Sequence, residues 1–264
     1  MADPGARAMH PFDLSNFTLA DMLRCGLEAR RVAKDLPTME DAASAIVRYF
    51  HAACVDPATT TRACALVRCY KTHRFDELEP EQQAFARRLL RDADAWPAMR
   101  CLTLLASAGD LPDWNSRRAS RGHLAIPLPS AGIVEEAPMI AQLIKQLGLD
   151  VASVLEPSPE VVRELLGKTY NVFHVEEALG SPYIPAQHDF VVRQRIRSVL
   201  GFGGMLPTGD LYAIILFARV PVPRGSADRF RTIALDVKSA LYFYRPDQIF
   251  SSVAGGGEGP LSVP

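Results

Sequence analysis

Residues 196–220 read IRSVLGFGGMLPTGDLYAIILFARV, and this stretch decides the fold. Apolar and small residues alternate over 198–202, and an unbroken apolar run occupies 211–218 between Asp210 and Arg219. Alternation is typical of a strand with one buried face, and a short bounded apolar run is typical of a strand buried on both faces. Pro207 and Gly209 supply the residues of a turn between them. The stretch therefore predicts two neighbouring strands, the second largely buried.

A helix is predicted directly after this hairpin, over residues 230–241. Its apolar residues recur at steps of three and four, which places them on one helix face: Phe230, Ile233, Ala234, Val237 and Leu241. We expect that face to pack on the sheet.

Two more helices are predicted before the first strand. Thr18 with Asp21, and Thr38 with Asp41, have the spacing of helix N-terminal caps. In the first of these helices the leucines of residues 19–27 lie on one face. That face either packs on the sheet or pairs with its copy in a second subunit and helps to transmit a signal.

The first strand is predicted over residues 62–73, with Cys64, Leu66, Arg68, Tyr70 and Thr72 on one face. An arginine inside such a strand needs a partner. Two interpretations stay open for Arg68, a salt bridge at the sheet rim and an anion site in a pocket. Trp114, in the polar turn after the next predicted strand (99–107), either caps a ligand site or covers the sheet edge.

Beyond these features, the pattern predicts a helix over 80–96, a short strand over 122–128, helices over 138–147 and 158–167, and a strand over 170–175. The loop 180–189 follows the last of these. None of the segments contains a GxSxG elbow or a GxxxxGK[ST] phosphate loop. We therefore expect a protein without catalytic activity of its own.

Three strings carry a resemblance to a known family: RACALVRCYKTH (62–73), CLTLLASAGDLPDWNSR (101–117) and YNVFHVEEALGSPYIPAQ (170–187). With the hairpin and helix above, the span 18–244 resembles the N-terminal GAF-like sensory module that precedes histidine kinase or other output domains in bacterial signalling proteins. The resemblance implies an α+β fold, in which an antiparallel sheet has helices on one face and a small-molecule pocket on the other. It also implies that residues 131–167 form a lid over the pocket.

Length and composition set the domain boundaries and exclude several classes of protein. We expect a disordered N-terminus (1–15), a single GAF-like domain (16–245) and a flexible tail or linker (246–264). The net charge of -1 offers no field for nucleic acid, and no apolar run approaches the length that crosses a bilayer. The five cysteines lack CxxC spacing, which favours reduced thiols in the cytoplasm.

The expected pocket combines aromatic walls with a few polar groups, as ligand pockets usually do. By position along the chain we assign to it Arg68, Tyr70, Trp114, His123, Tyr170, His174, Tyr183 and His188. Haem could bind through His123, His174 or His188, because one axial ligand needs no motif. The segment from Ser181 onward also resembles the pocket segment of phytochrome GAF domains, but Tyr183 replaces the acidic residue that contacts a bilin there, so a bilin is not expected.

The sequence thus predicts a non-enzymatic sensor that binds a small molecule and signals through its terminal helices to an output such as a histidine kinase. One alternative is an interaction module without a ligand, forming a homodimer through residues 19–27 and 230–241. A minor alternative follows from the resemblance, because one GAF family reduces free methionine sulfoxide with cysteine thiols. Cys64, Cys69 and Cys101 are the candidates for that chemistry, although the strand pattern places Cys64 and Cys69 on opposite faces.

Overall fold

The computed structural model describes residues 10–90, 94–120, 122–166, 168 and 170–251. Most of the expected disordered N-terminus, residues 1–9, and most of the expected tail, residues 252–264, lie outside the described residues. The same holds for 91–93, in the C-terminal part of the helix predicted over 80–96.

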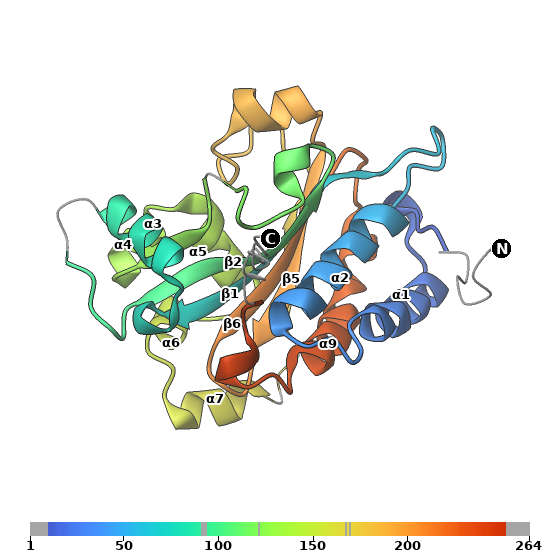
Figure 1. Ribbon diagram of the computed structural model, residues 1–264. Coiled ribbons are helices and arrows are strands. Elements are labelled where there is room, and N and C mark those ends of the chain that lie inside the picture. The colour runs from blue at the N-terminus through green and yellow to red at the C-terminus, as the bar shows by residue number, and fades with distance from the viewer. Residues whose placement is uncertain (1–9, 91–93, 121, 167, 169, 252–264) are drawn as a thin grey trace, which may run out of the picture.

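A six-stranded antiparallel sheet forms the centre of the molecule, with strand order β3-β2-β1-β6-β5-β4 (Figure 1). The strand bounds are β1 (Cys64–Arg74), β2 (Arg100–Gly109), β3 (Ala125–Leu128), β4 (Phe173–Val175), β5 (Ser198–Met205) and β6 (Leu211–Ala218). The hairpin of β5 and β6 is the one predicted, and Met205 pairs with Leu211 across its turn. Every residue of these two strands is buried. The predicted antiparallel sheet is confirmed.

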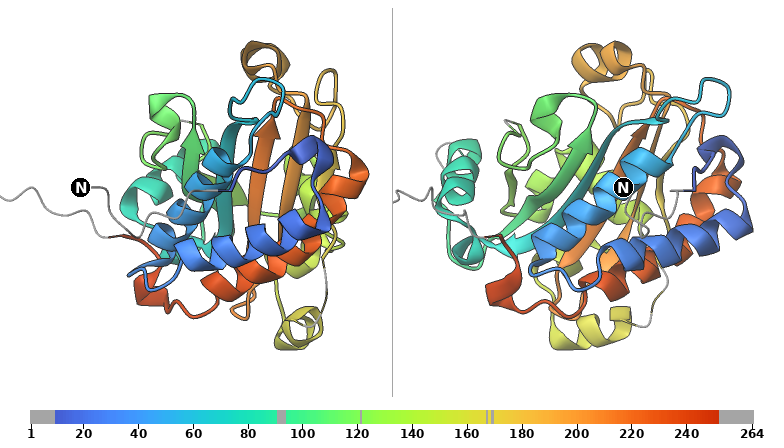
Figure 2. Two further views of the ribbon diagram at one scale, coloured as in Figure 1. Left: turned by 90° about the vertical axis from the view of Figure 1, so that its right-hand side faces the viewer. Right: turned by 45° about the vertical axis from the view of Figure 1, so that its right-hand side comes forward.

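Three helices cover one face of the sheet: α1 (Leu19–Val32), α2 (Met39–Ala53) and α9 (Phe230–Leu241). Thr18 caps α1, because its hydroxyl accepts a hydrogen bond from the N–H of Asp21 at 3.2 Å. Phe50 of α2 and Phe230 of α9 meet on Phe202 of β5, which anchors both helices to the sheet. Figures 1 and 2 show α1 running alongside α9, further from the strands.

The opposite face carries further helices, so that helices flank the sheet on both sides. They are α4 (Ala131–Glu135), α5 (Pro138–Gln146), α6 (Val151–Leu155) and α7 (Pro159–Leu166). The resemblance implied helices on one face of the sheet and a pocket on the other, and the 131–166 segment, most of the expected lid, buries its own apolar residues against β4 and β5. α3 (Pro80–Leu90) packs against β3. The short elements are η1 (Leu14–Asn16), η2 (Phe75–Glu77), η3 (Pro112–Trp114), the π-helical turn η4 (Gln187–Val192), α8 (Arg224–Asp228) and η5 (Pro246–Gln248).

The packed body begins before residue 16 and continues beyond residue 245. Phe12 and Leu14 are buried, and the N–H of Phe12 donates to the carbonyl of Ala53 at 2.7 Å. Near the other end, the carbonyl of Ile249 accepts from the N–H of Glu40 at 2.9 Å. Phe12, Leu14 and Ile249, which lie in the segments expected to be flexible, therefore belong to the core.

A β-bulge changes the predicted faces at the start of β1. The register shifts between Cys64 and Leu66, so Cys64 joins Val67 and Cys69 in the core beneath the α1, α2 and α9 layer. The prediction that Cys64 shares a face with Leu66 is wrong. From Leu66 onward the alternation holds, and Leu66 and Tyr70 lie in the core on the other side of the sheet.

Candidate functional site

A cavity of about 670 Å³ lies on the face of the sheet opposite α1, α2 and α9. Its floor consists of side chains from β1, β2 and β6, and its walls come from η3, residues 119, 120, 122 and 123, α5 and η4. The volume lies in the range of pockets that enclose a small organic molecule. Its polar and aromatic lining includes Arg68, Tyr70, Trp114, Ser120, His123 and Phe190.

Arg68 is the polar centre of this cavity. It reaches the cavity from the middle of β1, where Ile215 and Ser107 are its partners on the neighbouring strands. Its Nη1 donates to the hydroxyl of Tyr70 at 3.3 Å and lies 3.3 Å from Nδ1 of His123. Nη2 donates to Oγ of Ser120, also at 3.3 Å. All three contacts are long for hydrogen bonds to a guanidinium, so none holds it tightly.

Arg68 has no acidic partner among the described residues. The residue is only 9% exposed, and its Nε is buried without a hydrogen-bond acceptor. The one carboxylate in the cavity lining, that of Asp113, is exposed and forms no ion pair with it. The sequence left two interpretations open for Arg68. Within the described chain, the structure excludes the first of them, a salt bridge at the sheet rim. A buried cation without a counter-charge is unfavourable unless something else neutralises it.

Aromatic rings form a continuous wall on one side of the cavity. Trp114 contacts Phe190 edge to face, with 5.8 Å between the ring centroids, and Phe190 contacts Phe217 in the same way at 4.9 Å. These rings come from η3, η4 and β6, so the wall joins three distant parts of the chain. Trp114 therefore lines the cavity rather than merely covering the sheet edge.

α5 forms the opposite, aliphatic wall. Pro138 occupies its first turn, and Met139, Ile140 and Leu143 line the cavity. The resemblance implied that residues 131–167 form a lid over the pocket, but within the described part of that segment only residues between 137 and 143 contribute to the lining. Of the helices that follow, α6 packs against α4 and α5, and α7 packs against β5.

Four of the eight residues assigned to the pocket from the sequence meet in this cavity: Arg68, Tyr70, Trp114 and His123. The other four lie outside its lining. Tyr170 is buried in the core and donates to the carbonyl of Leu165 at 2.7 Å. His174 lies with Nε2 2.7 Å from the carbonyl oxygen of Val222, Tyr183 packs on the core, and His188 is exposed on η4.

Sequence reasoning missed several lining residues. Ile184, Pro185 and Ala186 line the cavity, whereas Tyr183 and His188, which the sequence assigned from the same loop, do not. Phe190 was missed because nothing in the sequence marks the π-helical turn that directs it inward. Ser120 carries no recognisable signal at all.

His123 lies at the rim, where it is exposed on one side and faces Arg68 on the other. Loss of hydration on the cavity side, with the positive charge of Arg68, lowers the pKa of its imidazole. The ring is therefore neutral near pH 7 and adds no positive charge to the site. Of the three histidines considered as haem ligands, His123 lines the cavity and the other two do not.

All five cysteines are buried, and none lines the cavity. Burial raises the pKa of Cys69 and of Cys101 to about 12, which keeps both as thiols at neutral pH. The bulge places Cys64 in the same core cluster as Cys69, so their predicted separation on opposite faces is wrong.

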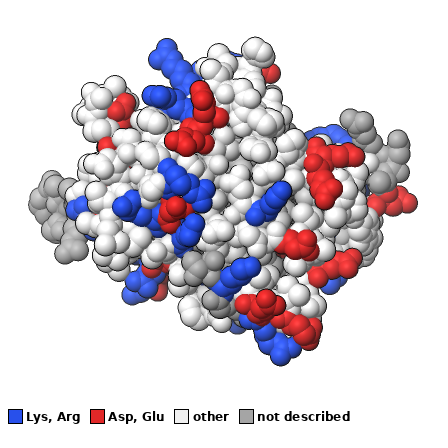
Figure 3. All heavy atoms as spheres, turned by 180° about the vertical axis from the view of Figure 1, so that it is seen from behind, with Lys and Arg blue, Asp and Glu red and all other residues white. Residues whose placement is uncertain are grey.

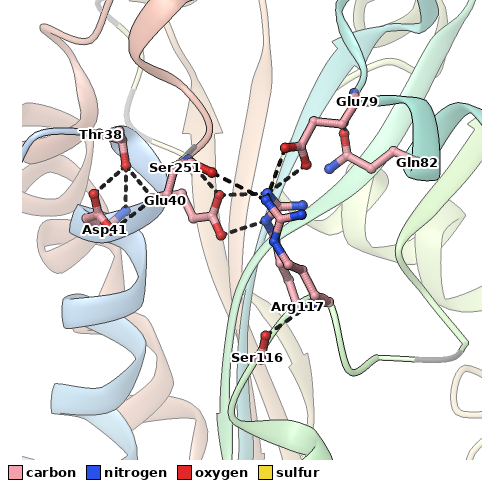
Figure 4. Close-up of polar contacts among 9 residues, drawn as sticks. Thr38, Glu40, Asp41, Glu79, Gln82, Ser116, Arg117 and Ser251 are labelled. Carbon is pink, nitrogen blue, oxygen red and sulfur yellow. Dashed lines mark hydrogen bonds and ion pairs between the residues drawn. The ribbon is translucent and has the colours of Figure 1, made fainter. Parts of the chain in front are cut away.

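The loop that carries Ser120 is fixed to the far end of the chain through Arg117 (Figure 4). The Arg117 side chain is 2% exposed, and its Nη2 donates to Glu40 at 2.8 Å and lies 2.7 Å from Glu79. The same Glu40 carboxylate accepts the N–H of Ser251 at 2.9 Å, and the Arg117 guanidinium lies 4.9 Å from the ring centroid of Phe250. One ionic cluster therefore joins the cavity loop, the start of α2 and the last described residues.

Two further hollows, of about 580 and 510 Å³, lie against α2 among the described residues. On the face in Figure 3, acidic and basic side chains are interspersed around a broad uncharged area. Within the described ranges, no group of His, Cys, Asp and Glu side chains suits a metal ion. No helix there has both the length and the apolar character that a membrane span requires.

Neither the family models nor the curated proteins compared with this chain gave a match. Among solved structures, the chain is similar to the N-acylhomoserine lactone dependent LuxR family transcription factor CepR2 from Burkholderia cenocepacia, at a TM-score of 0.38 and 12% identity over 85% of this chain and 95% of that one. It is also similar to the phycoerythrobilin-bound GAF domain of a cyanobacterial phytochrome, at a TM-score of 0.36 and 11% identity over 86% of this chain and 95% of that one. At these scores neither likeness bears on what this chain binds.

Proposed function

We propose that the chain is a GAF-like sensory domain that binds a small molecule in the cavity between the sheet and α5 and has no catalytic role. One observation carries the proposal: a largely apolar cavity of about 670 Å³ contains a buried arginine without an acidic partner among the described residues. Apolar surface left open to water and a buried charge without a counter-charge are both unfavourable for stability. A bound ligand removes both costs.

The proposal includes a route from the cavity to the C-terminal end. A ligand that contacts Arg68 also meets Ser120, which lies three residues after Arg117. Displacement of this loop would shift Arg117 against Glu40 and against the segment that carries Phe250 and Ser251. We infer that the cytoplasmic output, such as a histidine kinase, is controlled through this end of the domain.

A second candidate role is homodimer formation through α1. Leu19, Leu23 and Leu27 recur every four residues and are 62%, 57% and 58% exposed, so they form an apolar stripe on its outer side. Such a stripe suits pairing with its own copy. The apolar residues of α9 that the sequence offered for the same interface are buried against the sheet. Analytical sedimentation tests this role. The wild-type chain should sediment as a dimer and the Leu23→Glu variant as a monomer.

Native mass spectrometry of protein freshly purified from its host tests ligand binding, with an absorption spectrum taken on the same sample. The proposal expects an additional mass of a few hundred daltons, in the range of drug-sized ligands. Ala119→Trp fills the cavity from its loop and should abolish that mass, whereas Ala152→Trp on the exposed side of α6 should retain it. A wild-type protein of the unliganded mass would contradict the proposal.

A further inference from the structure

The cavity separates into one polar end and one apolar body. The polar end consists of Arg68, Tyr70, Ser120 and His123, all within one hydrogen-bonded group. The body consists of the aromatic wall and the aliphatic side chains of α5. A complementary molecule therefore has a single polar head and an uncharged, mostly hydrocarbon remainder.

Among the described residues, the polar end lacks an anion that neutralises the Arg68 guanidinium. Nε of Arg68 is buried without an acceptor, and the three contacts to its Nη atoms are all 3.3 Å long and involve uncharged side chains. A guanidinium presents its donors as a planar fork that matches the two oxygens of a carboxylate. The tyrosine and serine hydroxyls beside it can donate to the same anion.

The charge of the site limits the head to one negative charge. Arg68 is the sole cation in the described lining, because His123 is neutral near pH 7. Asp113 at the mouth adds a negative charge to the same cavity. A phosphate dianion would remain half neutralised here, whereas a carboxylate is balanced by one arginine.

We propose that the ligand is a small monocarboxylic acid with an apolar aliphatic or aromatic body, its carboxylate bound by Arg68 and Ser120 and its body held between α5 and the Trp114 to Phe217 wall. This inference rests on the proposed function and narrows it to a ligand class.

Calorimetric titration with a matched pair of probes tests the inference. The acid is 4-phenylbutyrate, and the neutral counterpart is 4-phenylbutan-1-ol, which has the same body without the charge. A charge-assisted hydrogen bond to a buried guanidinium should make the acid bind the wild-type chain at least about tenfold more tightly than the alcohol. Arg68→Met should remove this preference, and Arg68→Lys should retain part of it, because it keeps the charge and loses the fork.

Arg163→Met serves as the control for removal of a positive charge, since Arg163 lies on α7 with an exposed side chain and does not line the cavity. It should leave the preference unchanged. Equal binding of acid and alcohol to the wild type overturns the inference while leaving a cavity that binds small molecules. A preference for the acid that survives in Arg68→Met overturns it too, as does failure of both probes to bind. If Arg68→Met does not fold, Ser120→Ala replaces it and should weaken acid binding more than alcohol binding.

Discussion

Replacement of Arg117 by methionine tests whether the ionic cluster holds the cavity loop to the C-terminal segment. Arg117 and Arg118 are neighbours in sequence and both pair with Glu79, but their side chains are 2% and 35% exposed. The pair therefore offers a buried position with a matched half-exposed control. Although burial lowers the pKa of Arg117, hydrogen bonds and the charges of Glu40 and Glu79 raise it on balance, so the side chain is a cation.

The expected loss of stability in Arg117→Met comes from the carboxylates that lose their cation. Two partly buried carboxylates, those of Glu40 and Glu79, lose their shared cation, and the loss of one partner of a buried pair costs about 3 to 5 kcal/mol. Ser251 still donates to Glu40 at 2.9 Å, so the lower end, about 3 kcal/mol, is expected. Arg118→Met removes a more exposed contact of 3.1 Å to Glu79 and a hydrogen bond of 3.3 Å to the carbonyl of Ser251, and it should cost less than about 1 kcal/mol.

Urea unfolding followed by circular dichroism measures both free energies, and hydrogen exchange measures the local effect. Arg117→Met should speed exchange at the N–H of Ser251 and at the N–H of Glu40, which donates to Ile249. Equal losses of stability in the two variants, or unchanged exchange at these amides, would refute the role of Arg117 as the link.

Three further predictions concern stability. Arg68→Met removes a buried charge without an acidic partner in the described chain, so thermal unfolding should show the unliganded variant to be more stable by about 1 to 3 kcal/mol. A loss of stability would mean that the hydrogen bonds of Arg68 matter more than its charge. Burial lowers the pKa of His73 well below its ordinary 6.5, so the unfolded state binds more protons than the folded state at acidic pH. The free energy of unfolding should therefore fall as the pH drops below 6.5, by at most about 1.4 kcal/mol per pH unit. His73→Phe should flatten this dependence in urea titrations at pH 7.5 and 5, and an unchanged slope would exclude His73 as its source. A Cβ on Gly203 would overlap the carbonyl oxygen of Tyr212, so Gly203→Ala should lower the free energy of unfolding by about 3 kcal/mol or more. Gly122 has open space around it, so Gly122→Ala should lower it by less than about 1 kcal/mol. Similar melting temperatures for the two variants would contradict the close packing of β5 on β6.

The central elements of the fold were predictable because their signals are local. The apolar run of 211–218 and the caps at Thr18 and Thr38 each lie within one element, and the structure has the strand and both helices there. The side of the sheet on which Cys64 lies was not predictable, because the β-bulge depends on how β1 pairs with β6. The exposure of Leu23 was not predictable either, since the apolar residues of α1 divide between a buried side and an exposed stripe.

The candidate site was predictable only where a chemically unusual residue occurred in a regular element. Arg68 was found because a charge in the middle of an apolar strand demands a partner. Tyr170 was misplaced because the strand begins at Phe173, so the predicted alternation does not describe its direction. His174 lies within that strand, but its neighbours Phe173 and Val175 are the residues on the cavity side of the sheet. Ser120 reaches the cavity from an irregular loop, whose path only the tertiary structure defines.

A crystal structure of the protein purified without removal of bound molecules tests most directly that the cavity is a ligand site. We predict continuous density for one small molecule between α5 and the aromatic wall, with acceptor atoms within hydrogen-bond distance of the Arg68 guanidinium. A cavity closed by rearranged side chains, with Arg68 paired to a carboxylate of the chain itself, would contradict the account.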